Sequence, residues 1–289
     1  MITHPTIIAR AGAPLADGGP RRRPVGRIGG MAGVADEAAC NRLAAALGAG
    51  VQIVGEFGES LAADYDACFL DDRPIVSLDQ WRAILTTGRL ADVEGAFALA
   101  WREGADNLHL ARDAVGERTL FYAPIPNGLI FASSLRAILM SGSVPRRLNL
   151  RAVAAYLSYA YLPGRETLVE GIFELLPGEQ LNWSPAELQR APFWELPFPP
   201  IDHSSEQEQA LRLRALLEEA IRRRLPSPDE PVGAFLSGGL DSSLVVALAR
   251  QLHRAPIHTY SVSFGAGHAN ELPFSSLVAE HCGTIHRVV

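Results

Sequence analysis

The stretch FLSGGLDSS, residues 235–243, decides how the last third of this 289-residue sequence is expected to fold. It joins an apolar run (VGAFL, 232–236) to a second one (LVVALARQLH, 244–253), and a third follows (IHTYSVSF, 257–264). A strand, a glycine-rich loop, a helix buried on most faces and another strand predict a βαβ unit, and hence a parallel sheet. The loop then lies at the carboxyl end of a strand, where such sheets bind ligands.

The composition of this loop indicates an anion site. Gly238 and Gly239 let the backbone approach a ligand closely, and the amides of the following helix N-terminus attract phosphate. Asp241 would repel a phosphate unless a cation lay between them, which indicates Mg²⁺. Further donors come from three hydroxyls, on Ser237, Ser242 and Ser243. The alternative is a simple turn in which Asp241 or Ser237 caps the helix.

Composition limits the other possibilities. The net charge is −6, so nucleic acid is not an expected partner. All 26 basic residues counted are arginine, which excludes a Walker loop and any step by this chain that needs lysine. Cys40, Cys68 and Cys282 are isolated, so neither a disulfide framework nor a zinc site is expected. No signal sequence or membrane span is recognisable, and a cytoplasmic location is expected.

The first two thirds of the chain predict an α+β layered domain. Residues 1–27 are rich in Gly, Pro and Arg and are expected to be a flexible extension. Asn127 and Gly128 predict a hairpin turn with positive φ. Helices are expected at 37–48, 77–88 and 148–164. Strands are expected over six runs, at 51–57, 66–70, 95–101, 107–113, 119–125 and 128–134.

A proline-rich linker and a helix follow this domain. The helix is expected to begin near Ser205, with Glu208 completing a capping box. Its apolar stripe is predicted to comprise Leu213, Leu216, Leu217, Ala220 and Ile221. The predicted boundaries are an extension at 1–27, a first domain at 28–190, a linker at 191–204 and a second domain at 205–289.

The motif LSGGLDSS resembles the pyrophosphate-binding loop of the N-type ATP pyrophosphatases. From about residue 28 to the end, the chain is similar to the asparagine synthetase family, which includes β-lactam synthetases and lasso-peptide cyclases. The matching stretches are VEGAFALAW (93–101), ARDAVGERTLFY (111–122), FASSLRAIL (131–139), LPGEQL (176–181) and NELPFSSLVAEHCGTIH (270–286).

This resemblance implies a two-domain α+β and α/β fold. An N-terminal-nucleophile-type, glutaminase-like αββα sandwich would precede the start of a parallel-sheet ATP pyrophosphatase domain. It also implies an ATP-dependent ligase that forms an acyl-adenylate and pyrophosphate. Leu236 and Val262 would flank adenine and ribose, and Asp241 would hold Mg²⁺. Pyrophosphate would be held by Ser237, Gly238, Gly239, Asp241, Ser242 and Ser243.

The glutaminase part departs from the family pattern. Glutamine-dependent members expose a cysteine nucleophile as residue 1, whereas the matching run GGMAGV (29–34) places Gly29 there, inside the chain. The glutaminase is therefore expected to be inactive. Cys40 and Cys68 are interpreted as small core residues. Ser134 stands where the family commonly has glutamate, and Arg112 with Asp113 is interpreted as a structural ion pair.

The family's synthetase domain continues beyond the second strand of the βαβ unit with an SGxGxDE segment and a lysine, and neither is found here. The sequence is therefore expected to be a fragment with an exposed sheet edge after SVSF (261–264). A separate chain could complete the domain, and a homodimer is possible.

Three functions remain open. An amide ligase would join a small-molecule or peptide carboxylate, by default aspartate, to ammonia or a substrate amine. An intramolecular cyclase of the β-lactam synthetase or lasso-peptide type is the second. A non-catalytic ATP-binding remnant is the third.

Overall fold

The computed structural model describes residues 8–10, 27–33, 36–48, 51–54, 60–70, 73–103, 106–198, 202–263, 265 and 271–289. The chain divides into two compact units. Residues 20–198 form the larger unit, and residues 1–19 with 199–289 form the smaller unit. The expectation of two α/β units is confirmed, and each is described by itself.

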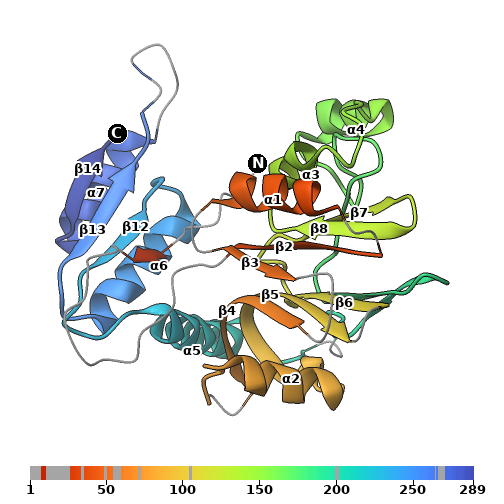
Figure 1. Cartoon of the computed structure of the whole chain (residues 1–289). Coiled ribbons are helices and arrows are strands. Elements are labelled where there is room, and N and C mark those ends of the chain that lie inside the picture. Colours follow the sequence, from red (N-terminus) through yellow and green to blue (C-terminus); the bar gives the residue numbers. More distant parts are fainter. Residues whose placement is uncertain are drawn as a thin grey trace. The chain divides into compact units, whose positions relative to one another are not determined.

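The larger unit contains two five-stranded sheets (Figure 1). The first has the order β3-β2-β8-β7-β9, with bounds Val51–Val54, Arg27–Ala32, Gly128–Ala132, Phe121–Ile125 and Phe173–Glu174. The second has the order β11-β10-β6-β5-β4, with bounds Leu188–Pro192, Glu179–Trp183, Asn107–Arg112, Val93–Glu103 and Ser60–Phe69. Strands β2, β9, β10 and β11 were not among the predicted ones.

Three apolar clusters hold these sheets and their helices together. One joins the facing sides of the two sheets, through residues such as Phe131 of β8 and Leu110 of β6. A second packs α1 (Glu37–Leu47) and α3 (Leu135–Ser141) on the first sheet. The third packs α2 (Leu78–Thr86) and the turn η1 (Leu90–Asp92) on the second sheet, around Trp81. Figure 1 shows α1 and α2 on the outer sides of the two sheets.

Several local predictions for this unit are confirmed. Helix α1 ends at Gly48, and the helix predicted at 77–88 is α2, which starts at a capping box between Ser77 and Gln80 that was not predicted. The helix predicted at 148–164 is α4, which is shorter (Leu150–Tyr159). Asn127 has φ of 58° in the turn between β7 and β8. A two-residue hairpin loop favours this conformation because its twist matches that of the strands.

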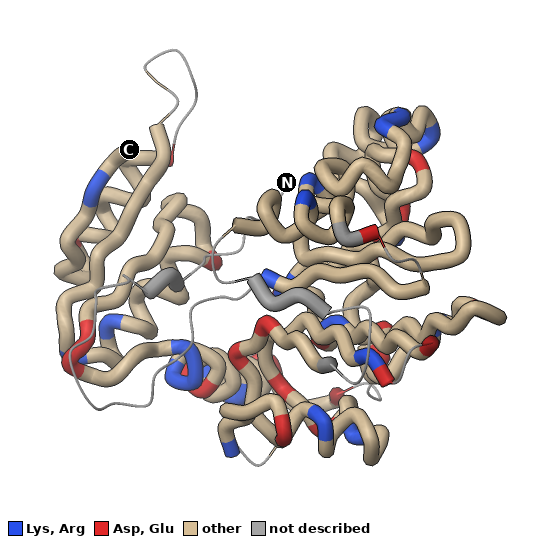
Figure 2. The backbone as a smooth tube through the Cα atoms, in the orientation of Figure 1, with Lys and Arg blue, Asp and Glu red and all other residues tan. Residues whose placement is uncertain are grey.

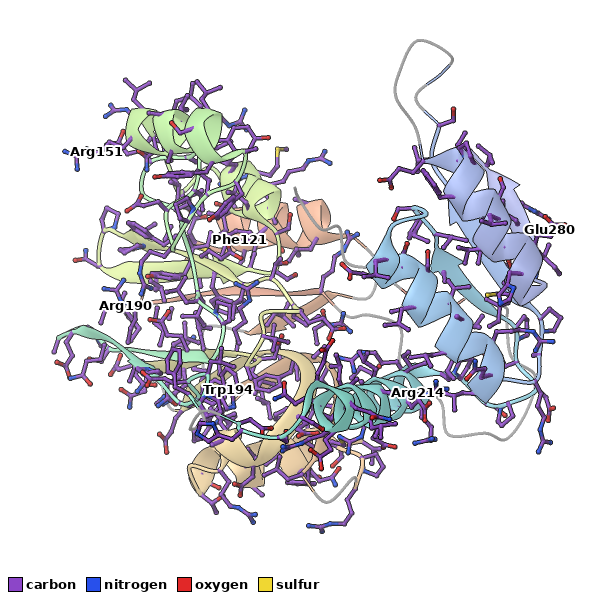
Figure 3. The ribbon with its side chains drawn as sticks, turned by 180° about the vertical axis from the view of Figure 1, so that it is seen from behind. Phe121, Arg151, Arg190, Trp194, Arg214 and Glu280 are labelled. Atoms are coloured by element: carbon purple, nitrogen blue, oxygen red, sulfur yellow. The ribbon has the colours of Figure 1, made fainter. Side chains whose placement is uncertain are left out.

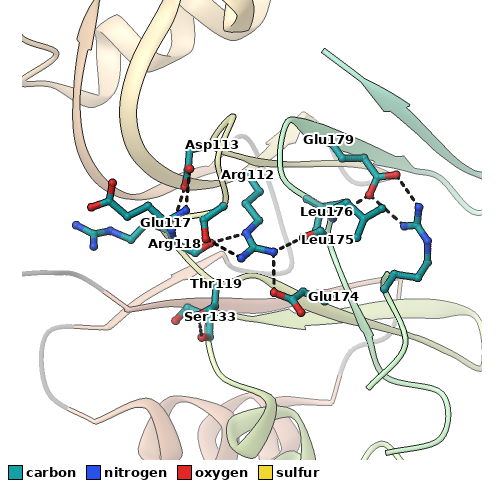
Figure 4. A network of polar contacts seen from close by, with 12 residues as sticks. Arg112, Asp113, Glu117, Arg118, Thr119, Ser133, Glu174, Leu175, Leu176 and Glu179 are labelled. Carbon is teal, nitrogen blue, oxygen red and sulfur yellow. Dashed lines mark hydrogen bonds and ion pairs between the residues drawn. The ribbon is translucent and has the colours of Figure 1, made fainter. Parts of the chain in front are cut away.

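A polar network fixes the loop after β6 (Figure 4). The predicted ion pair between Arg112 and Asp113 is wrong, because each binds other partners. Arg112 Nη1 lies 2.7 Å from Glu174 Oε1, and its guanidinium also donates to the carbonyls of Gly116, Arg118 and Leu175. Neighbouring residues on a strand point to opposite faces, so the two side chains diverge.

The carboxylate of Asp113 is fully buried and organises the same loop. It accepts hydrogen bonds from four backbone amides, those of Phe97, Val115, Glu117 and Arg118, at 2.8 to 3.3 Å. Backbone N–H groups stabilise a buried carboxylate without a cationic partner.

The smaller unit is built on a four-stranded sheet of order β1-β12-β13-β14. Its bounds are Ile8–Arg10, Val232–Phe235, Ile257–Ser261 and Ile285–Val288. Strand β1 pairs antiparallel with β12, and β12, β13 and β14 are parallel. Two expectations are corrected here. Residues 8–10 form a strand within the range expected to be a flexible extension, and β14 covers the edge of β13 that was expected to be exposed.

Three helices pack on one face of this sheet: α5 (Glu206–Arg224), α6 (Leu240–Leu252) and α7 (Leu272–Cys282). Helix α5 begins at the predicted capping box of Ser205 and Glu208. Arg214 of α5 is labelled in Figure 3. Its Nε donates to Glu218 Oε1 at 2.8 Å, and its Nη2 donates to Gln251 Oε1 of α6 at 3.3 Å.

The burial predicted for two of these helices is only partly correct. On α5, Leu217 and Ile221 pack inward, but Leu213, Leu216 and Ala220 are exposed. Helix α6, predicted to be buried on most faces, presents Leu244 to solvent. The reason is that the helices pack on one face of the sheet, so each helix has an outer side that faces away from it.

Charges of both signs occur on each unit in the described residues (Figure 2). On α5, acidic residues occupy the first turn and three arginines the last turn, which matches the helix dipole. None of the helices described is long and apolar enough to span a bilayer.

Replacing Asp113 by Asn should destabilise the larger unit by about 2–4 kcal/mol, because an amide group would face backbone donors that a carboxylate now satisfies. All four tryptophans lie in this unit, so denaturant unfolding followed by tryptophan fluorescence reports on it alone. Asp79→Asn, whose side chain is 95% exposed, is the matched control and should cost less than about 1 kcal/mol. Equal midpoints for the two variants would contradict the role given to Asp113.

Candidate functional site

The candidate site is the loop of residues 236–239 between β12 and α6. The parallel register of β12, β13 and β14 brings the carboxyl ends of all three strands to one edge of the sheet. The loop leaves β12 at this edge, in the position where open α/β sheets bind ligands. The strand, loop and helix predicted from the sequence are therefore where they were expected.

Gly238 gives the loop its shape. Its φ is 93°, which residues with a side chain rarely adopt. A Cβ at this position would lie 2.7 Å from the Ser275 nitrogen and 2.8 Å from the Glu271 oxygen, both backbone atoms of the α7 N-terminus. Only glycine fits, because the loop packs directly against the start of α7.

Serine hydroxyls form hydrogen bonds between residues of the loop and of the first turn of α6. Ser242 Oγ accepts from the Ser237 amide at 3.3 Å and lies 2.9 Å from Ser237 Oγ. Ser237 Oγ accepts from the Gly239 amide at 3.2 Å, and Ser243 Oγ donates to the Gly239 carbonyl at 2.7 Å. Ser242 is buried, with 5% of its surface exposed. Its hydroxyl therefore supports the loop, whereas Ser237 is exposed.

The first turn of α6 is left without a side-chain cap. Its N-cap is Gly239, and no side chain there makes a capping hydrogen bond. Neither Asp241 nor Ser237 caps the helix, so the caps that the simple-turn alternative expected are not present. Asp241 is exposed in this first turn. Uncapped amides at a helix N-terminus carry partial positive charge and attract an anion.

The two residues expected beside adenine and ribose lie in different surroundings. Leu236 is fully buried in the cluster beneath α6 and α7. Val262, which follows β13, is half exposed at the same edge of the sheet as the loop. Of the two, only Val262 presents a side chain at the surface.

Gly29, at the position expected for a glutaminase nucleophile, lies beneath helix α1. Gly29 lies inside β2, paired with Ile53 of β3 and Ala132 of β8. A Cβ there would lie 2.7 Å from Leu47 Cδ1 and 2.9 Å from Leu43 Cδ2 of α1. A side chain at this position would meet the helix that packs on the sheet.

The cysteines are partly as expected. Cys282 is buried, and burial raises the pKa of its thiol. Cys40 and Cys68, expected to be core residues, are only half buried. Ser134, at the position where glutamate was expected, is the N-cap residue of α3.

Sequence reasoning missed the polar residues beneath the loop. Ser261 of β13 donates to the Leu236 carbonyl, and Thr259 and His286 lie beside it on the same face of the sheet. The only signal in the sequence is that the small polar residues Thr259 and Ser261 alternate with His258 and Tyr260 along the strand.

Two protein families match the chain, one in each unit. The Asparagine synthase family matches residues 212–289, in the smaller unit. The family named Glutamine amidotransferase domain matches residues 82–194, in the larger unit.

Curated relatives are named as glutamine-hydrolyzing asparagine synthetases. A putative asparagine synthetase [glutamine-hydrolyzing] 2 of Methanocaldococcus jannaschii is 33% identical over 61% of this chain and 35% of its own length. Asparagine synthetase [glutamine-hydrolyzing] 3 of Bacillus subtilis is 32% identical over 60% of this chain and 29% of its own length. The chain thus spans about a third of the curated relatives it matches.

Similarity to solved structures is weaker. A glutamine phosphoribosylpyrophosphate amidotransferase from B. subtilis has a TM-score of 0.28 and 14% identity, over 81% of this chain and 46% of that chain. This value is too low to support any inference. The two family matches and the curated relatives, however, agree in order and in position along the sequence: over both units the chain is similar to asparagine synthetases.

Proposed function

We propose that this chain carries the ATP-activating loop of a ligase that converts a carboxylate into an amide. The observation that carries the proposal is the shape of residues 236–243. Three features meet at the carboxyl edge of a parallel sheet. They are a glycine with positive φ, serine hydroxyls that hydrogen bond within the loop, and a helix N-terminus without a side-chain cap. This arrangement suits a pyrophosphate group.

Asp241 fits the Mg²⁺ that accompanies ATP. No cluster of three or more metal-binding side chains occurs among the described residues. Mg²⁺ does not need such a cluster, because it commonly binds one or two carboxylates together with phosphate oxygens and water. Asp241 is exposed beside the loop and would hold the ion, whose charge would offset that of the phosphates.

In the proposed reaction, a substrate carboxylate oxygen attacks the α-phosphorus of ATP. A new bond joins that oxygen to phosphorus, the bond to the bridging oxygen breaks, and pyrophosphate leaves on the loop. An amine then attacks the acyl carbon, AMP leaves, and the amine loses a proton. Ser237, Gly238, Gly239 and Ser243 would hold the leaving pyrophosphate, with Ser242 closing the loop. Placing donors on developing charge is the main catalytic effect in such chemistry.

We also propose that the larger unit does not hydrolyse glutamine. The relatives are named glutamine-hydrolyzing, but this chain has Gly29 packed under α1 where the nucleophile is expected. The nitrogen would then come from free ammonia or from an amine of the substrate. Aspartate is the default carboxylate.

The second candidate is an enzyme that forms an intramolecular amide, as in β-lactam or lasso-peptide cyclisation. Glycine at the position of the glutaminase nucleophile favours it as much as the first candidate. A non-catalytic ATP-binding remnant is the third.

Isothermal titration of the 289-residue chain with ATP and Mg²⁺ tests the loop and its metal ligand. We expect wild type to bind, and Asp241→Asn to bind more than about tenfold more weakly, because the carboxylate that holds Mg²⁺ is lost. Without Mg²⁺ the variant should bind no worse than wild type, since a negative charge beside the phosphates is removed. Asp229→Asn, before the amino end of β12, is the matched control and should bind as wild type.

Each other outcome has a definite meaning. No binding by wild type refutes the ATP loop. Equal binding by Asp241→Asn with Mg²⁺ refutes only the metal ligand. Exchange of labelled pyrophosphate into ATP that depends on an added carboxylate would establish adenylation and exclude the remnant.

Installing the missing cysteine should not restore glutamine hydrolysis. In Gly29→Cys the new side chain would meet Leu43 and Leu47, and residue 29 has no free α-amine to act as base. We expect no release of glutamate from glutamine, and a loss of stability of about 1–3 kcal/mol by tryptophan fluorescence. Gly29→Ala should lose nearly as much, since the clash begins at Cβ. Glutamate release by Gly29→Cys above the level of Gly29→Ala would contradict the proposal.

A further inference from the structure

The peptide group between Leu236 and Ser237, where β12 becomes the loop, is held at both ends by buried serines. Its carbonyl accepts from Ser261 Oγ at 2.5 Å, and its N–H donates to Ser242 Oγ at 3.3 Å. Ser261 is 3% exposed and Ser242 is 5% exposed. The orientation of this peptide sets the direction in which the exposed Ser237 leaves the strand.

Ser261 is itself part of a longer row of polar groups. His286 of β14 lies opposite Thr259 of β13, so its ring sits between Thr259 and Ser261, two residues apart on one face. Its Nδ1 lies 3.0 Å from Thr259 Oγ1, and its Nε2 lies 3.5 Å from Ser261 Oγ. Thr259 Oγ1 lies 2.8 Å from Thr284 Oγ1.

The contact between His286 Nε2 and Ser261 Oγ selects one arrangement of the hydrogens when the imidazole is neutral. Ser261 has one hydroxyl hydrogen and gives it to the Leu236 carbonyl, so in this contact it accepts from His286. Nε2 of His286 then carries the hydrogen, and Nδ1 accepts from Thr259. Thr259 in turn accepts from Thr284, whose hydroxyl then does not donate to the Ala279 carbonyl 3.5 Å away. The result is a chain of donors that runs from Thr284 through His286 and ends on the first carbonyl of the loop.

The chain of hydrogen bonds lies beside an apolar cluster. It lies on the sheet face that also carries Ala234 and Leu236 and packs against Ala279 and Cys282 of α7. Thr259 is fully buried there. Polar groups in such a place cost free energy unless they are hydrogen bonded, and aligned hydrogen bonds reinforce one another. Apolar residues would fill the space equally well, but they would leave the Leu236 carbonyl without its donor.

We propose that His286 is a positioning residue for the pyrophosphate loop, acting through Ser261 on the Leu236–Ser237 peptide. The proposal deepens, and rests on, the ATP-binding function proposed above. His286 itself touches no ligand in this scheme. It keeps the Ser261 hydroxyl pointed at the loop carbonyl, and so fixes the direction of Ser237.

A pair of substitutions separates this role from simple packing. In His286→Gln the side-chain amide nitrogen can reach the place of Nε2 and still donate to Ser261. In His286→Asn the shorter amide reaches Thr259 but not Ser261. We expect His286→Asn and Ser261→Ala each to weaken binding of ATP with Mg²⁺ about five- to tenfold by calorimetry, and His286→Gln to stay within about twofold of wild type. Ser141→Ala, a buried serine of the larger unit, is the control and should bind as wild type.

The double variant Ser261→Ala with His286→Asn should bind no more weakly than Ser261→Ala alone, because both changes break the same chain. Additive losses would overturn the proposal. So would equal losses in the Gln and Asn variants, or no loss in Ser261→Ala.

Two measurements without nucleotide keep this test separate from the proposed function. Nitrogen-15 NMR of the neutral imidazole should show the hydrogen of His286 on Nε2. Exchange of the Ser237 amide with solvent should be faster in Ser261→Ala and His286→Asn, but not in His286→Gln. If wild type binds no ATP, the ATP function fails while these two readouts still decide the role of His286. A hydrogen on Nδ1, or unchanged exchange in Ser261→Ala, would refute that role.

Discussion

Parallel pairing of β12 with β13 and β14 is the constraint on which the candidate site depends. Parallel strands require crossover connections, and here α6 and α7 provide them on one face of the sheet. Both helices therefore start at the edge where the strands end. The loop before α6 and the first turn of α7 meet at that edge, and Gly238 is the residue that allows them to approach. The connectivity therefore places the candidate anion-binding loop at this edge before any side chain is considered.

The larger unit shows the opposite relation between fold and chemistry. Its two sheets, their helices and the buried Asp113 are all in place, so the scaffold of an amidotransferase domain is retained. Gly29, the residue at the position expected for the nucleophile, packs against Leu43 and Leu47. Under the proposal that this unit does not hydrolyse glutamine, the fold would persist without its activity, because the core and the reactive group are held by different interactions.

The sequence predicted what depends on neighbours along the chain. The strand, glycine loop and helix at 232–252, the capping box at Ser205 and the turn at Asn127 are all local patterns, and the structure has them. Interactions between distant segments were not predictable. Arg112 was paired with the adjacent Asp113, but its partner Glu174 is 62 residues away. Ser242 and Ser237 look alike in the sequence, yet one is buried and the other exposed. The alignment of Thr259, Ser261 and His286 requires knowledge of which strands are neighbours and in what register.

Strand β1 has a consequence for the order in which the protein can fold during synthesis. Ile8 pairs with Ala234, so the larger unit is inserted, in sequence, between two parts of the smaller one. At about 5–20 residues per second, the ribosome needs on the order of ten seconds or more between making the two strands. The larger unit can complete its core in that interval. Strand β12 is made later, and it then pairs with β1, which was synthesised before the whole larger unit.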